Sequence, residues 1–153
     1  KKRRQYQGKN IVFFPDYSSH PFSRKLLYMM RKKSLNPFKI DTNQYFEYLN
    51  NSKISYTTLS SFELLTPKIF ESMLSGSLTF TNTSKLYKYP RLNISEMIIE
   101  FENILDFREK INYYLSNPAE SQKIIDNAVD YCKKNHTYKK RIEYLFAKID
   151  KYL

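Results

Sequence analysis

Cysteine, glycine and tryptophan are scarce in this sequence. It has one cysteine, two glycines and no tryptophan among 153 residues. The single cysteine, Cys132, excludes a disulfide within the chain, as is typical of proteins in a reducing compartment, so we expect a cytoplasmic location. Neither a Walker A loop nor the glycine fingerprint of a dinucleotide site is present, because both motifs need closely spaced glycines.

Long hydrophobic runs are also missing. No apolar run approaches the ~18 residues that cross a bilayer. The first residues, KKRRQYQGKN, are basic and polar and lack the hydrophobic region of a signal peptide. The chain does not begin with methionine, so a fragment of a longer protein is one expectation.

Basic residues clearly outnumber acidic ones. Lys and Arg number 26 against 15 Asp and Glu, which gives a formal net charge of +11. Such an excess favours an anionic partner: a phosphate-bearing small molecule, a nucleic acid or a lipid surface. The basic residues are spread over separate clusters at 1–4, 31–33, 133–134 and 139–141. Each cluster taken alone is explained equally well as solvated surface.

Short apolar runs alternate with segments of helical periodicity. We predict strands at 10–15, 37–41, 53–59, 77–82 and 97–101, helices at 21–33, 42–51 and 66–76, a loop at 83–97, and a helical last third with apolar stripes at 104–115, 124–132 and 142–149. This order predicts an α/β fold with a Rossmann-like parallel sheet flanked by helices and a helical C-terminal third. We expect residues 1–153 to form one such domain.

The segment after the third predicted strand carries the candidate binding residues. In open parallel sheets, ligands bind beyond the carboxyl ends of the strands. Thr66 and Pro67 are typical of a helix start, and the amides of a helix start suit a phosphate. Lys68 adds positive charge in the first turn. Glu71 lies off the apolar stripe, where its carboxylate can accept hydrogen bonds from hydroxyls such as those of ribose.

A second glutamate, Glu63, precedes this helix and is placed to reach another part of the same ligand. By spacing alone, Glu63 and Glu71 fit the solvated face of an ordinary helix as well as a ligand site. The wider pattern favours the ligand site.

The stretch resembles the donor-nucleotide motif of retaining glycosyltransferases with the GT-B architecture. That motif has two glutamates separated by seven residues, the second followed by small residues and a glycine. Glu63 and Glu71 match the two glutamates, and SMLSG at 72–76 matches the tail. The form TPKIFESMLSG at 66–76 is most similar to the spore-maturation-type glycosyltransferases. The end of the chain, where NP is followed by a helix and by HTY and an arginine, also resembles that group.

This resemblance, which covers about residues 53–147, implies the donor-binding C-terminal half of a GT-B enzyme. The implied reaction transfers a sugar from a nucleotide diphosphate sugar to an acceptor that the sequence does not identify. Glu71 would hold the ribose hydroxyls, Glu63 would lie near the donor sugar, and Lys68 with the helix start would lie near the diphosphate.

The chain has no room for the N-terminal acceptor domain of such an enzyme, so we expect a separate acceptor-binding domain or subunit. One domain cannot form the cleft between two, so we do not expect turnover by this chain alone, and no catalytic residue is assigned. We expect no cofactor and no metal, because cationic side chains and a helix dipole can stabilise the diphosphate.

The first predicted strand departs from the family pattern. It runs into FPDYSS at 14–19 instead of a glycine-containing turn, and Pro15 has no N–H to offer a ligand. We expect Ser18, Ser19 and Arg24 to replace those contacts.

Two alternatives from another class make the chain a non-catalytic basic module. Its 14 tyrosines and basic clusters suit nucleic acid. The last predicted helix, with its basic residues opposite an apolar stripe, suits an anionic membrane surface, although we favour packing of this helix on the domain or on a missing partner. We interpret His136 as a structural residue at a helix junction and Cys132 as a core residue.

Overall fold

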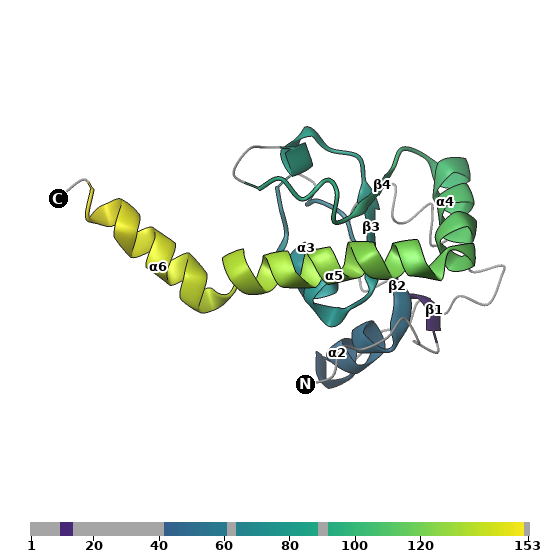
Figure 1. Ribbon diagram of the computed structural model, residues 1–153, viewed down its shortest axis with the longest axis horizontal. Coiled ribbons are helices and arrows are strands. Elements are labelled where there is room, and N and C mark those ends of the chain that lie inside the picture. The colour runs from purple at the N-terminus through teal and green to yellow at the C-terminus, as the bar shows by residue number, and fades with distance from the viewer. Residues whose placement is uncertain (1–9, 14–41, 61–63, 89–91, 152–153) are drawn as a thin grey trace.

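The computed structural model describes residues 10–13, 42–60, 64–88 and 92–151 (Figure 1). The helices and strands follow one another as β1 (Asn10–Phe13), α2 (Thr42–Asn50), β2 (Ser52–Tyr56), α3 (Pro67–Ser75), β3 (Leu78–Asn82), the 3₁₀ helix η1 (Lys85–Lys88), β4 (Ile99–Phe101), α4 (Ile104–Ser116), α5 (Pro118–Asn135) and α6 (Tyr138–Ile149). The helix and strand predicted at 21–33 and 37–41 lie outside the described residues.

The strands form one parallel sheet in the order β1-β2-β3-β4. In its register, Ile54 lies opposite Leu78, and Phe80 lies opposite Ile99. Neighbouring parallel strands need crossover connections, and α2 and α3 are the helices of two of them. This arrangement confirms the predicted Rossmann-like α/β fold with a helical C-terminal part.

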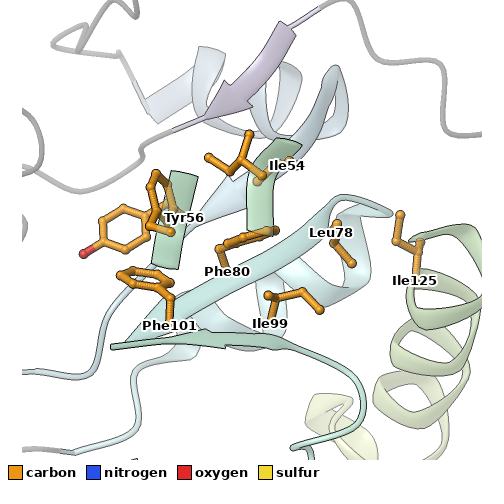
Figure 2. Close-up of a cluster of buried hydrophobic side chains, with 9 residues drawn as sticks. Ile54, Tyr56, Leu78, Phe80, Ile99, Phe101 and Ile125 are labelled. Atoms are coloured by element: carbon orange, nitrogen blue, oxygen red, sulfur yellow. The ribbon is translucent and has the colours of Figure 1, made fainter. Parts of the chain in front are cut away.

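Large apolar side chains cover one face of the sheet (Figure 2). Alternate strand residues point to the same face, and here they pack against α4 and α5. The buried cluster consists of Ile54, Tyr56, Leu78, Phe80, Ile99, Phe101, Phe107, Ile111 and Ile125. This cluster is the main core of the domain.

The opposite face of β2 and β3 carries small polar side chains, Ser55, Thr79 and Thr81, and Thr57 directly follows β2; all four are buried. Small side chains allow α3 to approach the sheet closely, and the hydroxyls of Ser55 and Ser72 are hydrogen bonded across that contact. The second core lies around α3 and consists of Leu59, Ile69, Phe70, Met73, Tyr87, Ile94, Ile98, Ala128 and Cys132. Because α5 contributes to both cores, it ties α3 to the rest of the domain.

Local chemistry sets the two ends of α3. Pro67 occupies the first turn after Thr66, which has an extended backbone, and Gly76 ends the helix at φ 81°. This left-handed conformation favours glycine. The predicted bounds of the helix are confirmed.

The prediction of a loop at 83–97 is wrong in part, because η1 forms within it. Tyr87 is fully buried, and its hydroxyl is hydrogen bonded to that of Thr81 over 2.7 Å. A buried tyrosine with a satisfied hydroxyl anchors this short helix on the sheet.

Helix α6 departs furthest from expectation. Its apolar stripe was predicted to be a packing face, but α6 has no buried residue. Figure 1 shows the helix projecting from the body of the domain, with the C-terminus at its far end. The apolar stripe of α6 therefore does not pack on the described domain, which was one of the two favoured possibilities.

Candidate functional site

The segment after β2 is held at the carboxyl edge of the sheet. The Leu59 N–H donates to Oδ1 of Asn82, the last residue of β3, over 3.3 Å. The Ser60 N–H donates to the Leu64 carbonyl over 2.9 Å, and the Leu64 N–H donates to Ser60 Oγ over 3.0 Å. These bonds place the entrance to α3 where parallel sheets bind their ligands.

Thr66 precedes α3 but does not cap it with its side chain. Its hydroxyl instead donates to the Thr58 carbonyl over 3.4 Å. The positive end of the helix dipole therefore meets no oxygen from the Thr66 side chain. A helix end of this kind favours an anion.

Glu71 is half-buried one turn beyond Pro67. Residues four apart lie on the same side of a helix, so Glu71 and Pro67 share one side of α3. The Tyr45 hydroxyl on α2 donates a hydrogen bond to Glu71 Oε2 over 2.9 Å. Sequence reasoning missed Tyr45, because the two residues are 26 positions apart and no local pattern links them.

Two buried threonines lie at the same edge. Thr57 and Thr58 directly follow β2 and are buried, and within the described part of the chain their Oγ1 atoms make no hydrogen bond. Thr79 Oγ1, in β3, shares this property. All three hydroxyls lie in the interior of the protein, so they do not line a surface that a ligand touches.

The predicted site residues fall into two groups. Thr66, Pro67, Lys68 and Glu71 come together in the entrance and first turns of α3. The others lie outside the described residues: Glu63, Ser18, Ser19 and Arg24.

A hollow of about 1280 Å³ lies beside this edge. We call it the α3–α6 hollow, since its walls come from the start of α3, residues 92–97, the end of α5 and α6. It is lined by Leu65, Thr66, Pro67, Phe70, Leu92, Asn93, Met97, Tyr131, Lys134, Asn135, His136, Lys140, Arg141, Tyr144 and Lys148. The volume exceeds the roughly 300–1,000 Å³ of common small-molecule pockets.

Stacked side chains lie among the residues that line the hollow. The His136 ring stacks on Phe70 with 4.3 Å between centroids, and the Arg141 guanidinium carbon lies 4.9 Å from the centroid of the same ring. His136 Nε2 lies 3.3 Å from the Tyr131 hydroxyl, which donates to the Leu92 carbonyl. His136 ends α5, so its predicted position at a helix junction is confirmed.

Burial and the charge of Arg141 shift the pKa values of His136 and of Cys132. Burial lowers the pKa of His136, and the positive charge of Arg141 lowers it further, so the imidazole is neutral at pH 7. Burial raises the pKa of the Cys132 thiol to about 12, against an opposing effect of Arg141. Cys132 is fully buried, which confirms its predicted place in the core and makes it a poor nucleophile.

Neither metal-binding clusters nor spanning helices occur in the residues described. Across 10–13, 42–60, 64–88 and 92–151, no three His, Cys, Asp or Glu side chains gather closely enough to hold a metal ion. In the same ranges, every helix is too short or too polar to cross a bilayer.

Comparison with known proteins identifies a family. No curated protein matches the chain. A model of the glycosyl transferase-like family matches residues 8–147, a range that contains the whole sheet, α3 and the cluster of His136, Phe70 and Arg141. With its parallel sheet and this match over most of its length, the chain belongs to the glycosyl transferase-like family.

Proposed function

We propose that this domain binds the nucleotide diphosphate sugar of a glycosyltransferase with the GT-B architecture. The observation that carries the proposal is the Glu71 carboxylate, held by Tyr45 one turn from the start of α3. One bond from Tyr45 leaves most of the roughly four acceptor sites of a carboxylate for ribose hydroxyls. The diphosphate then lies at the helix start, near Thr66, Pro67 and Lys68.

Glu63, three residues before Thr66, is proposed to lie near the donor sugar. Ser18, Ser19 and Arg24 remain proposals for further donor contacts.

The proposed reaction transfers the sugar from the diphosphate to an acceptor hydroxyl. The bond between the anomeric carbon and the diphosphate oxygen breaks, and the diphosphate leaves with the bonding electrons. The acceptor oxygen bonds to the same carbon, and its proton passes to the leaving diphosphate. We propose that a separate domain or subunit binds the acceptor, because the described residues form a single sheet with its flanking helices.

Calorimetric titration with UDP, GDP and their sugar conjugates tests the proposal. We expect one nucleotide to bind saturably and Glu71→Gln to weaken it by ~1–3 kcal/mol, because charged hydrogen bonds are lost. Glu109→Gln is the matched control, since Glu109 is an exposed glutamate on α4. Equal affinities of the two variants would show that Glu71 does not hold the nucleotide.

The same titrations separate a nucleic-acid-binding module from a donor-binding domain. Oligonucleotide binding to the basic surface would fall steeply with salt and would be indifferent to Glu71. Tight oligonucleotide binding of this kind, with no nucleotide binding, would overturn the proposal.

A second candidate function is association with an anionic membrane surface, and α6 favours it. Its large apolar side chains are between 43% and 89% exposed: Tyr138, Ile142, Leu145, Phe146 and Ile149. The same helix also carries four basic residues, Lys139, Lys140, Arg141 and Lys148. An exposed apolar face with neighbouring cations is typical of helices that lie on anionic lipid.

Co-sedimentation with vesicles tests this second candidate. Binding to vesicles of phosphatidylcholine with phosphatidylglycerol, but not of phosphatidylcholine alone, is expected, and Leu145→Glu should abolish it. Ala147→Glu adds the same charge to α6 outside the apolar stripe and is the control. Absence of binding to both vesicles, or equal loss in both variants, would exclude the apolar face of α6 as a lipid contact.

A further inference from the structure

The α3–α6 hollow opens directly onto the start of α3. Thr66 and Pro67 belong to its lining, and the same two residues form the helix start where the proposed function locates a diphosphate. The opposite wall comes from α6. A ligand bound at the helix start would therefore lie between α3 and the residues of α6 that line the hollow.

Helix α6 turns a cationic face to the hollow. The lining residues Lys140, Arg141, Tyr144 and Lys148 recur at helical spacing and so lie along one side of the helix. The exposed apolar residues of α6, such as Ile142 and Leu145, follow a different side. The helix thus faces the domain with its charges rather than with its apolar stripe.

Positive charge predominates among the described residues of the hollow. None of the described lining residues is Asp or Glu. Lys140 pairs with Glu143 over 2.9 Å, but among the described residues no carboxylate forms an ion pair with Lys134, Arg141 or Lys148. A concave surface lined by charges of one sign concentrates ions of the other sign.

Arg141 is held close to the start of α3. Its guanidinium carbon lies 4.9 Å from the centroid of the Phe70 ring, a cation–π contact. Phe70 is one helical turn after Thr66. The planar guanidinium has five N–H donors and can bind phosphate oxygens in pairs, so one face on Phe70 leaves donors at its rim for a ligand.

We infer that the α3–α6 hollow binds the diphosphate of the donor, with Arg141 and Lys134 as its cationic ligands. This inference rests on the proposed function and extends it, because it assigns the diphosphate to cations at the junction of α5 and α6. The shared chemistry is a phosphate group, which a nucleotide or a separate phosphate compound could supply.

Titration calorimetry with inorganic pyrophosphate, UDP and GDP tests the inference. We expect Arg141→Gln to weaken pyrophosphate and the preferred nucleotide by about tenfold or more, as is typical when a charge-assisted hydrogen bond is lost. Arg141→Lys should fall between Arg141→Gln and the unmodified protein. Glu71→Gln should weaken the nucleotide but leave pyrophosphate affinity unchanged.

Lys139→Gln is the matched control. Lys139 lies on the same helix with its side chain 85% exposed, and it is not part of the lining. Lys134→Gln is a second test variant, because Lys134 is exposed and its loss is measurable even if Arg141→Gln unfolds the domain. We expect Lys134→Gln to weaken pyrophosphate severalfold and Lys139→Gln to leave it unchanged.

The outcomes separate the inference from the proposed function. If the Arg141 and Lys134 variants bind pyrophosphate and nucleotide like Lys139→Gln, the inference is overturned, while a loss in Glu71→Gln still supports the donor site. If pyrophosphate binding depends on Arg141 but neither UDP nor GDP binds, the hollow takes its phosphate from a compound other than a nucleotide. That result would overturn both the assignment to the donor and the proposed function.

Discussion

The Tyr45 hydroxyl on α2 donates a hydrogen bond to the Glu71 carboxylate on α3 over 2.9 Å. The bond joins the two helices that precede and follow β2. It orients the carboxylate that we propose as the ribose ligand.

Tyr45→Phe is expected to lower nucleotide affinity severalfold, by about 0.5–1.5 kcal/mol, since one hydrogen bond to Glu71 is lost. The loss should be smaller than in Glu71→Gln. Titration calorimetry measures both. Tyr113→Phe is the matched control, because its hydroxyl also donates to a glutamate, Glu120, over 2.8 Å but on the exposed side of α4. Equal affinities for the two tyrosine variants would argue against a positioning role for Tyr45.

Phe107→Ala is expected to destabilise the domain by about 3–5 kcal/mol, because the cavity left in the main core does not fully collapse. Phe107 packs against Tyr56, Phe80 and Phe101 at centroid distances of 6.0, 5.6 and 4.7 Å. Urea denaturation measures the free energy of unfolding. Leu105→Ala on the same helix, where Leu105 is 69% exposed, is the control. It should change stability by about 0.5 kcal/mol or less, and a similar loss in both variants would contradict the assigned core.

The Cys132 thiol is expected to resist alkylation in the folded protein. Burial raises its pKa to about 12, so almost no thiolate is present at pH 8. Iodoacetamide labelling followed by mass spectrometry measures the rate. The rate should rise sharply in urea, where the thiol is solvated. Rapid labelling without urea would show that the contact between α3 and α5 opens readily.

Stability is expected to fall between pH 7.5 and 5.5 because of His136. Burial, and to a lesser extent Arg141, lowers the pKa of the folded imidazole, whereas the unfolded side chain takes up a proton near pH ~6.5. The unfolded state therefore binds more protons as the pH falls, and the contribution of the neutral imidazole is present above about pH 6.5 and lost below it.

Urea denaturation of the unmodified protein and of His136→Gln at both pH values checks this dependence. The variant should lose less stability on acidification. An identical decrease in both proteins would assign the effect to other groups.

Much of the fold was readable because its signals are local. Pro67 and Gly76 set the ends of α3 through their own backbone restrictions, and the apolar alternation of β3 is a property of five consecutive residues. The grouping of Thr66, Lys68 and Glu71 on one helix follows from the same local periodicity. The prediction of a loop failed at η1 because the burial of Tyr87 against the sheet, where Thr81 of β3 is hydrogen bonded to its hydroxyl, is a tertiary contact.

By itself, the sequence determined the order of most of the described helices and strands, the parallel sheet and the family, since periodicity, turn residues and motifs act over short stretches of chain. Only the tertiary structure decided that Tyr45 meets Glu71, that Phe70 packs with both His136 and Arg141, and that α6 exposes its apolar stripe. Such contacts join residues far apart in the chain. An apolar or charged stripe is visible in the sequence because it depends on local spacing. Which residues pack against that stripe depends on the path of the backbone through the whole fold.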